Sequence, residues 1–432
     1  MELNEKAEYY LNELESKYEE LQDEALRPNT VSYNACLSSF SKADSKKEAQ
    51  RCEAILHRMQ ERGDDEFLRP DSFTMTNVIS AWAHSNNPER AENILNAMQS
   101  MYEQGDEAMK PSVVSFGSVL HSWARQGNIS RAEAIVDHME QLMNIEGYEE
   151  MRPNTVIYNI LINCHAKSRE PDAIEKAEAI LAKMNKFKCE GYTCASPTSV
   201  TYNSVLSTIQ YCGGDNYIKA KDLLQQMEEM SSNDPSIRLE AITFTTFLRI
   251  LARSKLPKKA LLAERILSRM EQDLENVRLR PNNFTYDAVL QVCKSPASKD
   301  HQIRRHALLL AVKVFTKMQE MPHIKPTSYT YAEFFSVIGN LTGGNELIKL
   351  LERSFDDCCK AGVLDDKILN ILVRIAPANT LRNLLRTEHV VTSVSKLPKS
   401  WSRNSKYSVS KKTERITERS VHNTGRSRIR NY

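Results

Sequence analysis

The sequence has few of the residues that interrupt helices, and it lacks a long apolar run. Its 432 residues include only 13 Gly and 15 Pro, which is low for an all-β or disordered chain and typical of a helical one. No stretch of about eighteen apolar residues occurs, so we expect no membrane span. The Glu-rich start, MELNEKAEYYLNELESKYEE, has the pattern of neither a signal peptide nor an Arg-rich transit peptide, so no targeting peptide is visible.

Residue patterns that hold metals or carry out catalysis are missing as well. The nine cysteines include Cys189 with Cys194 and the adjacent Cys358 and Cys359, but no second pair at metal-ligand spacing accompanies them. Free thiols in a reduced compartment are therefore expected instead of a zinc site or disulfides. The sequence also lacks the Cys-x-x-Cys of a zinc deaminase and a Gly-rich phosphate loop. We expect no catalysis, no metal, no cofactor and no small-molecule substrate.

What the sequence does have is a residue, almost always aromatic, that recurs about every 42 residues. The steps between its eight positions are 41 to 45 residues, and seven of the eight are aromatic. These positions are Tyr33, Met75, Phe116, Tyr158, Tyr202, Phe244, Tyr286 and Tyr331. The stretch RPNTVSYN from Arg27 returns as RPNTVIYN from Arg152. A fixed period of this kind indicates an array of repeats.

Two amphipathic helices are predicted in each repeat. The recurring residue starts an apolar pattern at i, i+3, i+4 and i+7, which is one face of an α-helix. A second stripe follows with the pattern Ala-x-x-(Ile/Leu)-Leu-x-x-Met, as in Ala91 to Met98. A proline precedes each first helix except at Leu239, and it would end one pair and begin the next. Because one pair cannot bury its own stripe, stacked pairs are expected to form an all-α, right-handed α-solenoid.

The repeats divide the chain into four parts. Residues 1–29 are expected to hold only the second helix of a repeat, as an unusual cap or because the first helix is missing. The stripe of that helix would contain Ala7, Tyr10, Leu11 and Leu14. Seven repeats of 41–45 residues occupy 30–327, an eighth repeat and a C-terminal helical cap occupy 328–390, and a basic tail occupies 391–432.

The repeat resembles that of the pentatricopeptide repeat family. The resemblance rests on the strings VSYN, VIYN and VTYN, on the stripe of the second helix, and on closing strings such as RPD from Arg69. It covers about residues 30–340, but these repeats are longer than is usual in the family. The extra residues follow the second helix, where a longer helix or a loop is expected. The resemblance implies binding of single-stranded RNA, one base per repeat.

The resemblance implies that the residue two places before the recurring aromatic clamps a base from the side. All eight such residues are apolar, and they are Val31, Phe73, Val114, Val156, Val200, Ile242, Phe284 and Tyr329. Stacking with a base is worth about 1–3 kcal/mol for an aromatic side chain and less for Val. The alternative is that these residues belong to the core at the start of a helix.

The resemblance also implies two base-reading residues per repeat, one after the aromatic and one after the closing proline. The pairs are Asn34 with Asp71, Thr76 with Ser112, Gly117 with Asn154, Asn159 with Thr198, Asn203 with Glu240, Thr245 with Asn282, and Asp287 with Thr327. The first pair resembles the family's uridine reader, the sixth its adenine reader, and the fourth a pyrimidine reader. The other four lie outside the family's code, and Gly117 has no side chain for a base edge. No target sequence can therefore be written.

Phosphate contacts require cations on the same face as the bases. Nine residues after the aromatic stand Lys42, His84, Arg125, Lys167, Tyr211, Arg253 and Ser295. The Lys and Arg residues of this set, Lys42, Arg125, Lys167 and Arg253, are the predicted phosphate ligands. The alternative is a purely structural role, because a cation near a helix C-terminus is stabilised by the helix dipole.

The charge is unevenly placed along the chain. Residues 392–432 contain 11 Lys and Arg against 2 Glu, a net charge of +9, so the rest, with 47 against 54, carries −7. The Ser- and Arg-rich tail is expected to be mostly disordered. It would either add non-specific affinity for RNA through counterion release or be a solvated tail without a partner. Trp401, isolated in this tail, is a candidate aromatic anchor.

Three functions follow from these observations. The leading hypothesis is sequence-selective single-stranded RNA binding in organellar RNA processing, stability or translation. A tetratricopeptide-like protein scaffold is the second, although the Trp-x-x-Leu-Gly-x-x-Tyr head of those repeats is missing. The third is a subunit of a mitochondrial ribonucleoprotein complex that contacts other subunits. The resemblance implies the mitochondrion, or alternatively the plastid.

Overall fold

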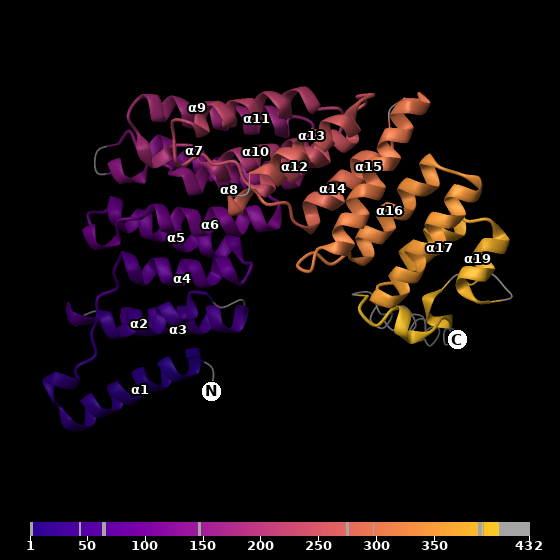
Figure 1. The fold of residues 1–432 in the computed structure, drawn as a ribbon. Coiled ribbons are helices and arrows are strands. Elements are labelled where there is room, and N and C mark those ends of the chain that lie inside the picture. Colours follow the sequence, from indigo (N-terminus) through magenta and orange to yellow (C-terminus); the bar gives the residue numbers. More distant parts are fainter. Residues whose placement is uncertain are drawn as a thin grey trace, which may run out of the picture. The chain divides into compact units, whose positions relative to one another are not determined.

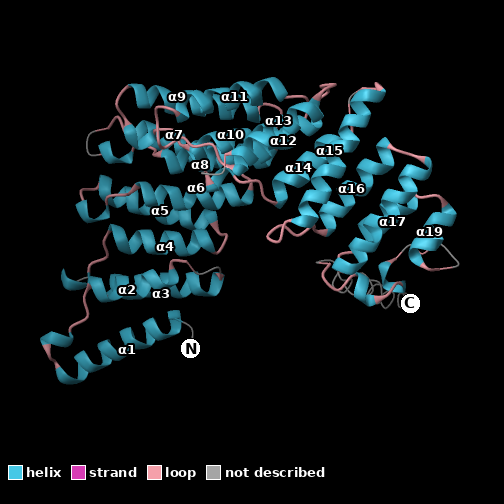
Figure 2. Ribbon diagram, viewed as in Figure 1, coloured by secondary structure: helices cyan, strands magenta, loops and turns pink. Residues whose placement is uncertain are grey.

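The chain forms only helices and loops wherever its structure is described. The computed structural model describes residues 3–42, 45–62, 66–145, 148–273, 276–296, 298–387, 391 and 393–405. Within them there are α-helices and short 3-10 helices but no strand (Figure 2). The chain folds into two compact units, the first made of residues 1–212 and 229–238, the second of 213–228 and 239–432.

The predicted pairs of helices are present in both units. The first helices of the pairs are α2 (Thr30–Phe40), α4 (Ser72–His84), α6 (Val113–Gln126), α8 (Thr155–Ser168), α10 (Ser199–Cys212), α12 (Ala241–Arg253), α14 (Asn283–Lys294), α16 (Ser328–Leu341) and α18 (Asp366–Ile375). The second helices are α1 (Leu3–Leu21), α3 (Lys46–Glu61), α5 (Pro88–Glu103), α7 (Ile129–Leu142), α9 (Ala173–Cys189), α11 (Tyr217–Ser231), α13 (Lys259–Gln272), α15 (His301–Glu320), α17 (Gly344–Ala361) and α19 (Ala378–Leu385).

Within each unit the pairs stack as a solenoid, which confirms the predicted all-α fold. In the first unit α2, α4, α6, α8 and α10 pack on one another in that order, and Figure 1 shows the lower pairs as successive rungs. In the second unit α12, α14, α16 and α18 do the same. Most second helices pack on the first helix of their own pair and on that of the next pair, as α3 does on α2 and α4 and α13 does on α12 and α14. Each apolar stripe is thus buried between neighbours.

The two predicted stripes make up the core. All eight recurring residues of the first helices are at most 3% exposed. The Met residues that close the second stripes are at most 1% exposed, and they are Met59, Met98, Met139, Met184, Met227, Met270 and Met318. Burial of this many large apolar side chains, at about 1.5–3 kcal/mol each, is the main force that holds the pairs together.

The extra residues that lengthen the repeat form loops with a 3-10 turn in most repeats. These turns are η1 (Glu24–Leu26), η2 (Glu66–Leu68), η3 (Glu107–Met109), η4 (Glu149–Met151), η5 (Thr193–Ala195) and η6 (Val277–Leu279). An apolar residue two places before the proline position is buried in seven loops, at Leu68, Met109, Met151, Ala195, Ile237, Leu279 and Ile324. This residue anchors the loop, so the longer repeat keeps the spacing of the first helices.

Helix α1 occupies the place of a second helix and packs on α2, as predicted. Its stripe is only partly buried, however. Leu11 is 4% exposed, but Tyr10 is 65% exposed, so the expectation that Tyr10 lies in a buried stripe is wrong. The reason is that within the described residues no first helix of its own pair covers α1. In α5, where the pair is complete, the equivalent Ile94 is buried.

The C-terminal end differs from the expected disordered tail over residues 393–405. Two 3-10 turns, η7 (Val394–Lys396) and η8 (Lys399–Trp401), pack on the last helices. Trp401 lies edge-to-face on Phe355 of α17, with ring centroids 5.6 Å apart, and its carbonyl accepts a hydrogen bond from Leu364. Trp401 is thus an anchor, because its indole completes an apolar surface of α17. Residues 406–432 lie outside the described residues.

Candidate functional site

In each unit the predicted clamping residues form a row of exposed apolar side chains on the first helices. Their exposed fractions range from 37% for Tyr329 to 74% for Val31, whereas the aromatic positions two residues later are buried. This excludes the alternative that they are core residues. Tyr329 is the least exposed of the eight, and the Lys367 ammonium lies 4.8 Å from the centroid of its ring. Exposed apolar residues at one repeated register mark a surface that contacts a ligand.

The base-reading residue after each proline position is also the N-cap of the next first helix. Its side chain accepts a hydrogen bond from a backbone N–H of the first turn in five repeats, at Asp71, Ser112, Asn154, Asn282 and Thr327. The residue three places later is Ser or Thr in most repeats, and its hydroxyl bonds back to the N-cap. Capping holds each of these reading side chains in a fixed position.

The two readers of a repeat are brought together, directly or through that hydroxyl. Asn34 Nδ2 donates to Asp71 Oδ1 over 3.2 Å. In the next repeat Thr76 Oγ1 lies 3.3 Å from Ser115 Oγ, which is 2.9 Å from Ser112 Oγ.

The same bridge recurs in the second unit. Thr245 Oγ1 lies 2.9 Å from Thr285 Oγ1, whose hydroxyl donates to Asn282 Oδ1 over 3.3 Å. Asp287 and Thr327 likewise both contact Thr330. The paired residues therefore belong to one polar site in each of these repeats.

Other readers stand in a different arrangement. The backbone N–H of Thr198 donates to the Thr201 hydroxyl over 3.1 Å, and the Thr198 side chain is half-buried at the start of α10. Asn203 belongs to the first unit and Glu240 to the second, so each is described only within its own unit.

Three reading residues carry a buried oxygen atom that has no hydrogen-bond partner among the described residues. These atoms are Oδ1 of Asn34, Asn159 and Asp287, all one position after the recurring aromatic. A buried polar atom without a partner costs about 1–3 kcal/mol, so native proteins seldom leave one unexplained. Their recurrence at one register makes these oxygens candidate acceptors for a ligand.

A pocket of about 350 Å³ lies between two clamping residues of the first unit. Val114 and Val156 stand among its walls, with Gly117 and Asn154 at the reading positions and His121 beside them. A Cβ atom at Gly117 would lie 3.1 Å from Ile157 Cδ1, so a larger residue there would narrow the pocket. Gly117 has no side chain that could read a base, and for the same reason it leaves space in the pocket.

The predicted phosphate ligands lie on the exposed surface. Lys42, Arg125, Lys167 and Arg253 are all exposed, with Lys42 two residues beyond the end of α2. Each follows its clamping residue by 11 positions, which is about three helical turns, so both occupy one side of the helix. The Arg125 guanidinium donates to the carbonyl of His84 over 3.2 Å.

Positive charges gather around the pocket between Val114 and Val156. Burial lowers the pKa of His121, and the charges of Arg125, His84 and Lys167 lower it further. His121 is therefore uncharged near neutral pH, and Arg125 and Lys167, from two successive repeats, are the permanently charged cations beside it. An anion placed there would be stabilised by the field of these cations.

The second helices carry a different feature, a carboxylate that joins two repeats. Glu140 of α7 accepts from the Tyr158 hydroxyl over 2.9 Å and pairs with Lys183 of α9 over 2.6 Å. Glu271 does the same with Tyr286 and Lys317.

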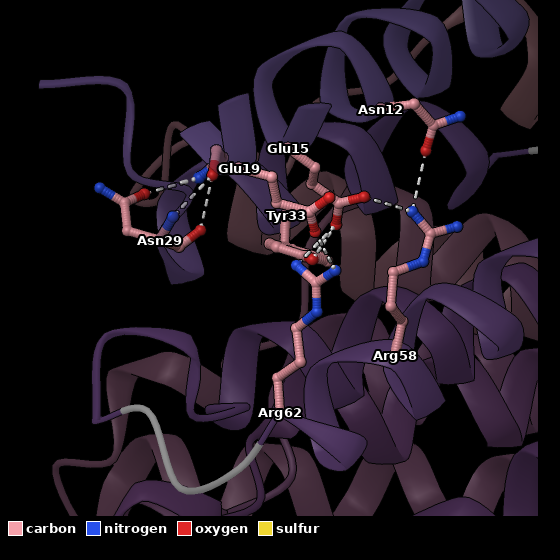
Figure 3. Close-up of polar contacts among 8 residues, drawn as sticks. Asn12, Glu15, Glu19, Asn29, Tyr33, Arg58 and Arg62 are labelled. Carbon is pink, nitrogen blue, oxygen red and sulfur yellow. Dashed lines mark hydrogen bonds and ion pairs between the residues drawn. The ribbon is translucent and has the colours of Figure 1, made fainter. Parts of the chain in front are cut away.

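At the N-terminus Glu15 of α1 contacts Tyr33 and Arg58, with Arg62 beside them (Figure 3). Together with burial, the Glu15 carboxylate raises the pKa of the Tyr33 phenol. These networks fix the position of α1 on the first complete pair. Sequence reasoning missed them, because a single Glu in a helix has no distinctive pattern.

None of the described helices is long and apolar enough to cross a membrane. No group of three or more His, Cys, Asp or Glu side chains within the described ranges is arranged to hold a metal ion.

The stacked pairs of helices, with a row of exposed apolar residues on the first helices, define a helical repeat solenoid. Comparison with known families agrees with this class of protein. A model of the pentatricopeptide repeat domain matches residues 99–168, 148–211 and 226–295. A model of the PPR repeat matches residues 73–102. The chain belongs to the pentatricopeptide repeat family.

Two solved structures are similar to this chain. The crystal structure of PPR10 from maize is 19% identical, with 89% of this chain and 56% of that chain covered and a TM-score of 0.43. PPR10 in complex with an 18-nt psaJ RNA element is 17% identical, with 96% and 62% covered and a TM-score of 0.34. The chain thus spans 56% to 62% of the length of these structures. Comparison with curated proteins gave no match.

Proposed function

We propose that the protein binds single-stranded RNA along its first helices, with one base held between the clamping residues of successive repeats. The row of exposed apolar clamps is the observation that carries this proposal. In the free protein these side chains are exposed to water, and stacking with a base would bury them. The unpartnered oxygens of Asn34 and Asn159 support it, since they stand where base edges would lie. Membership in the pentatricopeptide repeat family points to the same ligand.

The polar sites suggest what each repeat reads. The Asn34–Asp71 site would take uridine and the Thr245–Asn282 site adenine, as their resemblance to the family's readers implies. Arg125 and Lys167 would contact phosphates near the pocket between Val114 and Val156. The protein would act as a binding protein and not as an enzyme, in the processing, stability or translation of organellar RNA. The mitochondrion is the proposed compartment, with the plastid as the alternative.

Filter binding against pooled RNAs over a range of salt concentrations tests the proposal. Four or five phosphate contacts predict a log–log salt slope of about −3, at about −0.7 for each contact with a single strand. Absence of binding at low salt would contradict RNA binding altogether.

A double change at the first full site tests the reading of one base. Replacing Asn34→Ala together with Asp71→Ala should relax the preference at a single position of the bound sequence. An unchanged preference would mean that this site does not read RNA in the proposed way.

A second candidate function is that of a subunit in a ribonucleoprotein complex. A groove of about 450 Å³ between α7 and α9 favours it, because it has an apolar floor with Val136 and Ile180 and charged walls with Glu133 and Lys176. The second helices α7 and α9 and part of α8 line this groove, and none of the clamps is among its lining residues. A charge reversal such as Lys183→Glu should release the protein from such a particle in sedimentation while RNA affinity is kept. Loss of both together would contradict a separate protein-binding surface.

A further inference from the structure

The repeat headed by Tyr286 has an acid at its first reading position. Asp287 of α14 lies three residues after the clamp Phe284, so both occupy neighbouring positions on one side of the helix. Its side chain is only 5% exposed, and its Oδ1 atom has no hydrogen-bond partner within the described chain. The carboxylate does accept a hydrogen bond from the Thr330 hydroxyl on α16. Thr330 uses one acceptor position of the carboxylate, so each of the two oxygens keeps at least one lone pair that can accept a hydrogen bond from a ligand.

The charged groups around Asp287 come from both neighbouring first helices. Glu333 and the Tyr329 phenol face it from α16, and Arg249 faces it from α12. On its own helix Lys294 pairs with Glu333 over 3.1 Å. The pKa of Asp287 is raised to about 6, and burial is the largest cause. The Thr330 hydrogen bond lowers the pKa, the Glu333 carboxylate raises it, and Arg249 lowers it slightly, so the value of about 6 is the sum of these effects. The carboxyl is therefore ionised at pH 7.5 but is protonated in mild acid.

We propose that Asp287 makes this repeat select guanine, an inference that rests on the RNA binding proposed above. An ionised carboxylate accepts hydrogen bonds and donates none. Guanine presents two adjacent N–H donors on its Watson–Crick edge. Adenine and cytosine place a ring nitrogen acceptor beside their amino group, and uracil places its one N–H between two carbonyls. Guanine is therefore the only base that can pair with the carboxylate without placing one of its own acceptor atoms against a carboxylate oxygen.

Protonation reverses this selectivity. The neutral carboxyl gains an O–H donor, which pairs with the ring nitrogen of cytosine or adenine while its carbonyl oxygen accepts from their amino group. The preference for guanine is thus present above pH 6 and is lost as the pH falls through about 6. Asn at the same position offers a donor and an acceptor at every pH, so it cannot reproduce this dependence.

Selection of bound sequences from a random RNA pool by the full chain tests the proposal. The wild-type protein at pH 7.5 should enrich a motif with guanine at one position, and Asp287→Asn should change that position alone. With four synthetic RNAs that differ only there, guanine should be favoured at least about fivefold at pH 7.5. The same wild-type protein should lose this preference at pH 5, a measurement that needs no variant to fold.

Two controls make the outcome specific. Asp356→Asn on α17 makes the same change of charge at an exposed ion pair with Lys360, and it should leave the motif unchanged. Glu333→Gln should keep guanine at pH 7.5 and move the loss of preference to a lower pH. If the wild type enriches no motif, RNA reading itself is contradicted. If it enriches a motif that Asp287→Asn leaves intact, or one that is independent of pH, the role of Asp287 is overturned.

Discussion

The first and the second helices of this protein differ in how their apolar side chains are buried and how their polar groups are paired. On the second helices, carboxylates such as Glu140 and Glu271 are hydrogen-bonded and paired with a cation of the next repeat. On the first helices, apolar clamps are exposed and the Oδ1 atoms of Asn34 and Asp287 have no partner in the described chain. Folding stability alone favours the first arrangement and opposes the second. Under the proposed function, the exposed clamps and unpartnered oxygens of the first helices are explained by an RNA ligand.

The largest expected effect concerns two residues only two positions apart on α6. Phe116→Ala removes a buried ring and should lower the free energy of unfolding by about 3–5 kcal/mol, as measured by urea denaturation. Val114→Ala removes two exposed methyl groups and should change the free energy of unfolding by no more than about 0.5 kcal/mol. Similar losses for both variants would contradict the separation between core and clamp.

The next effect is on binding without an effect on stability. Phe73→Ala removes an exposed aromatic clamp, so RNA affinity should fall by about 1–3 kcal/mol while thermal unfolding stays the same. Fluorescence anisotropy with a selected RNA measures the first quantity and circular dichroism the second. A drop in both would place Phe73 in the core, against its 57% exposure.

A smaller effect separates the cations of the first helices from those of the second helices. Arg125→Gln with Lys167→Gln should make the salt slope of RNA binding shallower by about 1.4, since each single-strand phosphate contact contributes about 0.7. Arg131→Gln is the matched control, because Arg131 lies on α7 and pairs with Glu92. Equal changes for Arg131 and for the Arg125–Lys167 pair would show that the response is one of overall charge.

The smallest expected effect is a shift in the titration of His121. Its pKa lies below the ordinary value in the free protein, and RNA phosphate beside Arg125 and Lys167 should raise it, because an anion stabilises the imidazolium. NMR titration of the imidazole with and without RNA measures the change. An unchanged or lowered pKa would place the phosphates elsewhere.

Most of the fold could be predicted because one pattern is written eight times. The register of Tyr33 and its equivalents predicted the first helices and their buried faces, and all eight of these residues are buried. The capping role of Asp71 was not predicted from the sequence and is seen only in the structure. The anchor of the long loop is visible in strings such as LRP and MKP.

The rest depends on contacts between distant residues. Nothing in the sequence indicates that Glu15 and Arg58 would meet around Tyr33, because 43 residues separate the two charges. The burial of Asp287 beside Glu333 is likewise a product of how α14 and α16 pack. Trp401 stood out by its isolation, but only the structure places it on Phe355.

The shared N-cap has a consequence for how such a protein changes its target over evolution. Asp71, Ser112, Asn154, Asn282 and Thr327 each cap a helix with the side chain that would also read a base. Replacing a capping residue by one that cannot cap costs about 1 kcal/mol. Mutations at this position are therefore tolerated mainly among Asn, Asp, Ser and Thr. The need to cap a helix therefore limits which residues can provide a new base specificity, whatever the RNA target is.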